Sequence, residues 1–144
     1  MYIKCKHVHW KKRIYFFGML GITLLLTACS VKKLHTGKLR DIEFAVMDYE
    51  DLPGELQKKI NEKKKETMML TYSDKGWTYI VRGYGTEEKT GYSVSVNACY
   101  EEEQSIVLET ELLGPKRSEK IKNKKTYPYV VIKIEDVDKS VLFQ

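Results

Sequence analysis

An uncharged apolar run that ends in a cysteine constrains this chain more than any other feature. Residues 14–28 (IYFFGMLGITLLLTA) carry no charge, and the 13 residues before them are basic and aromatic without a single acid. A basic segment followed by a short apolar one is typical of a signal peptide. Fifteen apolar residues are fewer than the roughly 20 that a helix needs to cross a bilayer core, so a retained membrane anchor is the weaker alternative. The sequence therefore predicts export and removal of residues 1–28.

The four residues that close this run, Leu26-Thr27-Ala28-Cys29, resemble the lipobox of bacterial lipoproteins. The resemblance implies cleavage before Cys29 and attachment of a diacylglyceryl group to its sulfur, with fatty acids such as palmitate. Two or more acyl chains hold a protein stably on a membrane, whereas one chain binds only reversibly. We therefore expect a lipoprotein of the cell membrane or outer envelope, anchored on the extracytoplasmic side.

The charge of the whole chain is misleading about its partners. The formal net charge is +5, but five of the 25 Lys and Arg residues precede Cys29, which leaves 20 basic against 20 acidic residues. A strongly basic chain would suggest a nucleic-acid partner. The mature chain is neutral, so no nucleic-acid partner is expected.

The residue types that most catalytic sites need are scarce. Removal of the leader and lipidation of Cys29 would leave one cysteine, Cys99, and one histidine, His35. A disulfide needs a pair of cysteines, a zinc site needs three or four ligands, and a hydrolytic nucleophile needs a base beside it. The sequence predicts no catalytic residue, metal or cofactor, and it predicts that Cys99 is a small buried hydrophobic residue.

The mature chain divides into a tether and one domain. Residues 29–40 are polar and basic, and we interpret them as a lipidated tether, with a single folded domain over 41–144. Residues 41–48 alternate, with Ile42, Phe44 and Val46 on one face, which predicts a first strand. A helix is expected next, with Asp51 as its N-cap. Its apolar stripe consists of Leu52, Leu56 and Ile60.

The rest of the domain has the pattern of strands. A hairpin is predicted over 68–72 and 77–82, followed by a bulge or close backbone approach at Gly83-Tyr84-Gly85. Alternation over 91–97 places Tyr92, Val94, Val96 and Ala98 on one face, and a strand over 105–113 completes a second hairpin. A loop over 114–126 precedes strands at 130–135 and 141–143. The expected fold is α+β: a small antiparallel sheet or partly rolled sandwich of six or seven strands with one packed helix.

The stretch from Gly83 to Val96 (GYGTEEKTGYSVSV) is similar to the C-terminal domain of the PrcB family of bacterial lipoproteins, as are Gly114-Pro115 and residues 126–131 (TYPYVV). The similarity covers residues 79–134. It implies an accessory subunit of a secreted or surface protease complex, without catalytic residues of its own.

Two groups of residues are candidates for binding. Tyr84 and Tyr92 are the aromatic residues of the glycine-rich stretch, and core or sheet packing is the competing interpretation for Tyr92. The loop over 114–126 carries six basic residues: Lys116, Arg117, Lys120, Lys122, Lys124 and Lys125. Such a loop can meet an acidic protein, an anionic polymer or lipid, although a solvated loop is the simpler interpretation. The leading hypothesis is a membrane-anchored, non-catalytic protein-interaction module that serves an exported protease; the alternative is a binder of envelope polymer or peptide that acts as a sensor or protease inhibitor.

Overall fold

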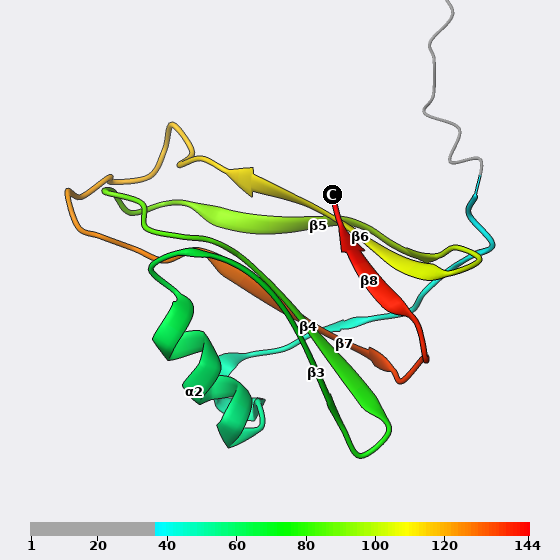
Figure 1. Ribbon diagram of the computed structural model, residues 1–144. Helices are drawn as coiled ribbons and strands as arrows, with labels where there is room; N and C mark the ends of the chain where they lie inside the picture. The colour runs from blue at the N-terminus through cyan, green and yellow to red at the C-terminus, as the bar shows by residue number, and fades with distance from the viewer. Residues whose placement is uncertain (1–36) are drawn as a thin grey trace, which may run out of the picture. The chain divides into compact units, whose positions relative to one another are not determined.

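The computed structural model describes residues 37–144, which form two four-stranded β-sheets and one α-helix (Figure 1). The predicted signal peptide, the lipidation site Cys29 and most of the predicted tether lie outside the described residues. The elements in chain order are β1 (Arg40–Asp41), β2 (Ala45–Val46), a 3-10 helix η2 (Tyr49–Asp51), α2 (Gly54–Lys63), β3 (Thr67–Asp74), β4 (Trp77–Tyr84), β5 (Ser93–Glu101), β6 (Ser105–Leu113), β7 (Tyr129–Glu135) and β8 (Ser140–Phe143). The predicted α+β sandwich is confirmed, with eight strands in this region.

The two sheets have the strand orders β1-β5-β6-β8 and β2-β7-β4-β3, and we call them the upper and lower sheet after their places in Figure 1. All neighbouring strands are antiparallel except β6 and β8, which run parallel. One apolar core lies between the two sheets and contains Ile80, Ile106, Leu108 and Ile132. A second core lies between the lower sheet and α2. The lower sheet is therefore the middle layer of the domain.

The prediction of one continuous strand over residues 41–48 is wrong, because this stretch contains parts of two short strands, β1 and β2. The Ile42 N–H donates to the carbonyl of Cys99 in the upper sheet (2.9 Å), whereas the Met47 N–H donates to Val131 in the lower sheet (2.9 Å). The chain crosses between the sheets within this stretch, so the alternation of faces is lost. Ile42 packs against the core between the sheets, but the side chains of Phe44 and Val46 are 39% and 63% exposed. This split also accounts for the eighth strand.

Pairing also begins earlier than the predicted domain boundary. Arg40 is already part of β1 and pairs with Glu101 of β5. The N–H of Leu39 donates to the carbonyl of Glu101 at 2.8 Å. Residues 39 and 40 therefore extend the upper sheet, because their backbone groups continue the β5 ladder.

The predicted apolar stripe of the helix is confirmed, because Leu52, Leu56 and Ile60 are at most 5% exposed and pack on the lower sheet. The predicted N-cap is wrong. Asp51 belongs to η2, Pro53 occupies the N-cap position, and no side chain caps the helix. Two residues separate Asp51 from Gly54, so its carboxylate is too far back along the chain to cap the first turn. No helix within residues 37–144 is long and apolar enough to span a membrane.

The predicted β3–β4 hairpin is confirmed, with a two-residue turn at Lys75-Gly76. Both residues have positive φ (49° and 79°), as a type I′ turn requires. The register from Thr67 to Tyr84 is continuous, so Gly83 marks a close approach and not a bulge. A Cβ at Gly83 would lie 2.6 Å from Met68 Cε and 3.3 Å from Met68 Cβ, so a side chain there would require Met68 to move.

The bulge lies instead in β5, where the register shifts between Val96 and Ala98. This shift reverses the alternation, so Cys99 and not Ala98 enters the core between the sheets. The predicted inward face of β5 is therefore right for Val94 and Val96 and wrong for Ala98.

Candidate functional site

Tyr84, the first aromatic candidate, links the two sheets. Its side chain is partly buried, and its hydroxyl lies 2.9 Å from Thr110 Oγ1 in β6. The Arg82 guanidinium carbon lies 4.6 Å from the centre of its ring, which is a cation–π contact. Tyr84 therefore connects the two sheets, and only part of its side chain is exposed to solvent.

Tyr92, the second candidate, lines a surface hollow of about 420 Å³ that the chain builds from three separate segments. The hollow also contains Val46 to Tyr49 and the Tyr127-Pro128-Tyr129 stretch that leads into β7. Tyr92 is partly buried there. Tyr84 is not among the residues that line this hollow, and its hydroxyl contacts Thr110 of β6. The two candidate tyrosines therefore do not share one site.

All six basic residues of the 114–126 loop are exposed. This loop is held against the loop over 86–91 by bonds that the sequence did not reveal. The Thr90 N–H donates to the carbonyl of Lys122 (3.0 Å), and the Lys122 N–H donates to Thr90 Oγ1 (3.0 Å). Lys125 pairs with Glu88 at 3.4 Å. The basic loop is therefore attached to a neighbouring segment although its cationic side chains face solvent.

Gly91 explains how these two loops come together. Its φ is +94°, and a Cβ there would lie 2.6 Å from Pro115 Cβ. A side chain at this position would push the loops apart. The glycine and the Gly114-Pro115 stretch are both parts of the similarity noted from the sequence, and here they form one contact.

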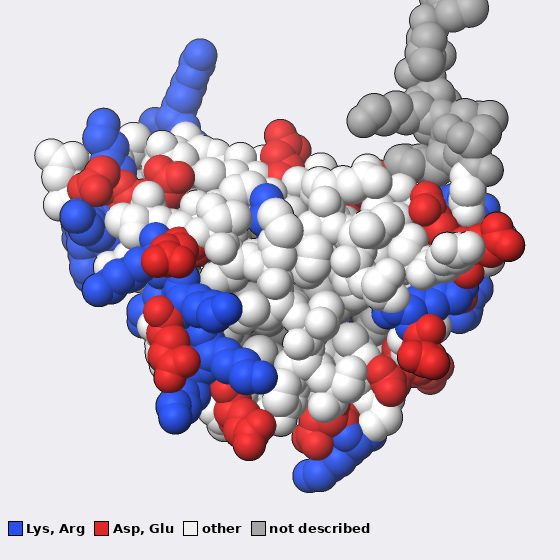
Figure 2. Space-filling view, in the orientation of Figure 1, with Lys and Arg blue, Asp and Glu red and all other residues white. Residues whose placement is uncertain are grey.

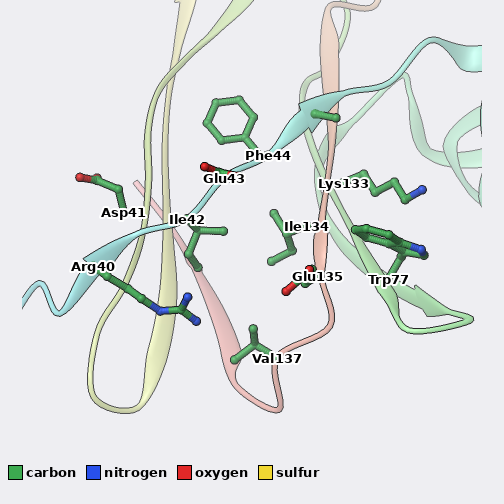
Figure 3. A pocket seen from close by; sticks show the side chains of 11 residues that line it. Arg40, Asp41, Ile42, Glu43, Phe44, Trp77, Lys133, Ile134, Glu135 and Val137 are labelled. Atoms are coloured by element: carbon green, nitrogen blue, oxygen red, sulfur yellow. The ribbon is translucent and has the colours of Figure 1, made fainter.

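A groove that the sequence did not predict lies where the chain crosses from the upper to the lower sheet (Figure 3). Its volume is about 590 Å³. The crossing segment supplies one wall and the ends of β4 and β7 supply the other. The lining residues are Arg40, Asp41, Ile42, Glu43, Phe44, Ala45, Trp77, Lys133, Ile134, Glu135 and Val137.

Polar and apolar groups contribute about equally to the accessible surface of this groove. Phe44 and Trp77 are each 39% exposed, and Ile134 belongs to the core between the sheets. The Lys133 ammonium lies 4.2 Å from the centre of the Trp77 ring and 5.9 Å from that of Tyr79. This cation is therefore already placed over two aromatic faces. Exposed aromatic side chains next to a concave surface are typical of contact sites for polypeptides.

The charges at one end of the groove are paired. Arg40 contacts Glu101 at 2.5 Å, and Lys139 contacts the other oxygen of Glu101 at 2.7 Å. The hydrogen bonds from Lys139 and Arg40 hold the pKa of Glu101 below its ordinary value. Asp41 pairs with Lys38 at 2.5 Å. Glu43 and Glu135 make no ion pair with any residue of the 37–144 region, so the groove presents two free carboxylates beside its apolar wall.

The lining of the groove contains no serine, threonine, cysteine or histidine. No cluster of three His, Cys, Asp or Glu side chains suited to a metal ion occurs in the part of the chain that the structure describes. Cys99 is 3% exposed and unpaired, as predicted, and burial raises its pKa to about 11. A neutral, buried thiol is unreactive.

No signal in the sequence pointed to this groove. The sequence predicts Phe44 on the apolar face of the first strand and Trp77 at the start of a hairpin strand. The groove depends on the crossing segment leaving one ladder and joining another.

Comparison with known proteins gives one finding. Residues 78–135 match the model of a family described as PrcB C-terminal. The match runs from the second residue of β4 to the last residue of β7, one residue beyond the predicted range at each end. No curated protein and no solved structure matches the chain.

Proposed function

Because residues 78–135 match the model of the PrcB C-terminal family, we propose that this chain is a non-catalytic accessory subunit of an exported protease complex. The family match is the observation that carries the proposal. It spans β4 to β7 and therefore includes strands of both sheets. The protein would act by holding or orienting a protease through noncovalent contacts.

The groove beside Phe44 and Trp77 is the contact surface that we propose for this partner. Two exposed aromatic rings provide apolar area, and aromatic anchors dominate the energy of many interfaces. Glu43 and Glu135 add negative charge beside that area, which favours a partner segment with basic and aliphatic side chains. Lys133, Ile134 and Glu135 of the groove fall within the family match.

The lipid on Cys29 is the second part of the proposal. Anchoring would restrict the domain to the membrane surface, so that a weak partner on the same surface is met at a raised effective concentration. The amino-acid pattern of residues 14–29 supports this anchor.

The test is crosslinking in cells that make the full chain, followed by purification from membranes and identification of partners by mass spectrometry. We expect a protease among the crosslinked proteins, and less of it when Phe44 and Trp77 are both changed to serine. Leu142→Ser is the matched control, because Leu142 is 47% exposed and lies outside the groove. Recovery of no protease from the unaltered chain would refute the complex, whereas equal recovery with all variants would refute only the groove.

The proposed lipid on Cys29 requires a separate measurement. The mass of the mature N-terminus should correspond to a diacylglyceryl cysteine at position 29. Cys29→Ala should leave the leader attached and abolish this mass. An unmodified N-terminus at another residue would contradict the lipid anchor.

A second candidate function is supported by the exposure of all six basic side chains of the 114–126 loop. In this case the domain would bind an anionic envelope polymer as a sensor or inhibitor. The full chain should then be retained on isolated cell-wall material at low salt, and exchange of the six basic residues for glutamine should release it. Retention that does not change with these substitutions would remove this candidate.

A further inference from the structure

Arg82 of β4 has a guanidinium whose buried nitrogens lack acceptors. Its Nε and Nη1 atoms are closed to solvent and have no hydrogen-bond partner in the structure. A buried charged donor without an acceptor is expensive, and native proteins rarely keep one. The groups packed around Arg82 should therefore explain why the chain keeps a guanidinium there.

The position of Arg82 is at the margin of the core between the sheets. It lies two residues beyond Ile80, which is fully buried in that core, and so on the same face of the lower sheet. Its neighbours across the ladders are Met69 in β3 and Val130 in β7. Met69 is 52% exposed, whereas Val130 is 8% exposed. The upper sheet thus covers β4 and β7 on this face but leaves β3 open.

The open part of this face continues along β3. Thr67, Met69, Thr71 and Ser73 share the side of β3 that faces the upper sheet, and all four are exposed. In the view of Figure 2 the broad centre of the molecule carries almost no charged side chains, and most of them gather at its margins. None of these four residues of β3 is charged, and a guanidinium beside uncharged groups interacts more strongly with an anion than one surrounded by other charges and water.

Tyr84 and Thr110 hold the guanidinium without satisfying its donors. The Tyr84 ring lies 4.6 Å from the guanidinium carbon, and its hydroxyl is bonded to Thr110 Oγ1 at 2.9 Å. The ring face stabilises positive charge but does not replace the in-plane oxygen acceptors that Nε and Nη1 require. Arg82 makes no ion pair with any carboxylate of residues 37–144.

We propose that Arg82 is a receptor for a carboxylate carried by a peptide segment that enters beside β3. A carboxylate matches the fork of an arginine in shape and charge and accepts two parallel N–H bonds. Met69 lies across the ladder from Arg82, and its flexible, exposed side chain can move aside to admit an apolar residue next to the carboxylate. This site is separate from the Phe44–Trp77 groove and does not require the partner to be a protease.

The carboxylate can come from a peptide C-terminus or from an acidic side chain, and three peptides distinguish these sources. The probes are N-acetyl-Ala-Ala-Leu with a free C-terminus, the same peptide as its amide, and N-acetyl-Ala-Glu-Leu amide. The full chain in detergent is titrated with each, and the Arg82 Nε–H resonance is followed by NMR. We expect a saturable shift with at least one of the two carboxylate peptides and none with the neutral amide. Absence of a shift with both carboxylates, or an equal shift with the neutral amide, would overturn the proposal.

Substitutions separate a receptor from a structural arginine. Arg82→Met should abolish carboxylate binding, measured by calorimetry, yet leave the melting temperature unchanged or higher because an unpaired buried charge is removed. Arg82→Lys keeps the charge without the fork and should weaken binding by about tenfold or more. Lys58→Met is the control at an exposed cation of α2, outside the basic loop and the groove, and should bind like the unaltered chain. If Arg82→Met still binds, the site is elsewhere, and a lower melting temperature with unaltered binding would assign Arg82 a structural role.

Discussion

At the scale of single residues, close approach and burial determine which side chains this domain tolerates. Gly83 has Met68 on one side and Tyr129 on the other, with 2.6 and 3.4 Å to the nearest atoms of each from an added Cβ. Cys99 lies in the core between the sheets, where the thiolate form would be poorly solvated. Both positions lead to predictions that a purified chain can test.

Gly83→Ala should destabilise the domain, because the new methyl overlaps Met68 and forces the core next to α2 to shift. Overpacking of this kind costs about 1–3 kcal/mol. Urea unfolding measures the effect. Gly54→Ala is the control, since nothing lies within 4 Å of a Cβ at that position; a loss as large for Gly54→Ala as for Gly83→Ala would contradict this explanation.

Because of Cys99, the free energy of unfolding should decrease as the pH rises in alkaline solution. Its pKa is about 11 in the folded state against an ordinary value of 9.0, so the unfolded chain loses the proton first. The contribution of the neutral Cys99 thiol to the free energy of unfolding is complete below pH 9 and is lost between pH 9 and 11. The free energy of unfolding of Cys99→Ala should decline less over this interval than that of the unaltered chain. Identical pH profiles would show that the thiol does not contribute.

At the scale of elements, Glu101 connects three segments that are distant in sequence. Its carboxylate receives Arg40 from β1 and Lys139 from the connection between β7 and β8, while Glu101 itself ends β5. The short strands β1 and β8 are thereby linked to the longest hairpin of the upper sheet. Strands of two and four residues have few ladder bonds, so such links affect whether β1 and β8 stay paired.

Glu101→Gln should reduce stability at neutral pH and flatten the loss of stability in acid. The pKa of Glu101 is held below 4.5 by its hydrogen bonds to Lys139 and Arg40. Its contribution is therefore present above pH 4.5 and is lost as the pH falls through the lower, folded-state pKa. Amide exchange at residues 39–42 should also become faster. Glu103→Gln in the adjacent turn is the exposed control and should change neither measurement.

At the scale of the whole molecule, the lower sheet belongs to both cores and should make unfolding cooperative. Leu56 lies in the core next to α2 and Leu108 in the core between the sheets, and both are fully buried. Because Ile80 and Val81 of β4 face opposite cores, loss of either core leaves this strand exposed on one side. The two cores are therefore parts of one folding unit.

Leu56→Ala and Leu108→Ala should each cost about 2–5 kcal/mol, and each should shift one common transition. Far-UV circular dichroism and tryptophan fluorescence measure the transition separately. Leu39→Ala is the control, because Leu39 is 63% exposed. Separate transitions for the two probes in either variant would show that the cores unfold independently.

The local patterns of the sequence determined the apolar stripe of α2, the β3–β4 hairpin and the similarity of residues 78–135 to the PrcB C-terminal family. These features depend on neighbours within a few positions: the helical repeat, the Lys75-Gly76 turn and strand alternation. Such short-range information is present in the amino-acid order itself.

Only the tertiary structure decided where the chain changes sheets, where β5 bulges and which side chains line the groove. The crossing segment alternates like a strand, yet hydrogen bonds to Cys99 at one end and Val131 at the other divide it between two ladders. Phe44 is exposed for that reason, and Arg82 lies at the margin of the core because the upper sheet covers β4 but not β3. These outcomes depend on contacts between residues far apart in the chain, which no local periodicity encodes.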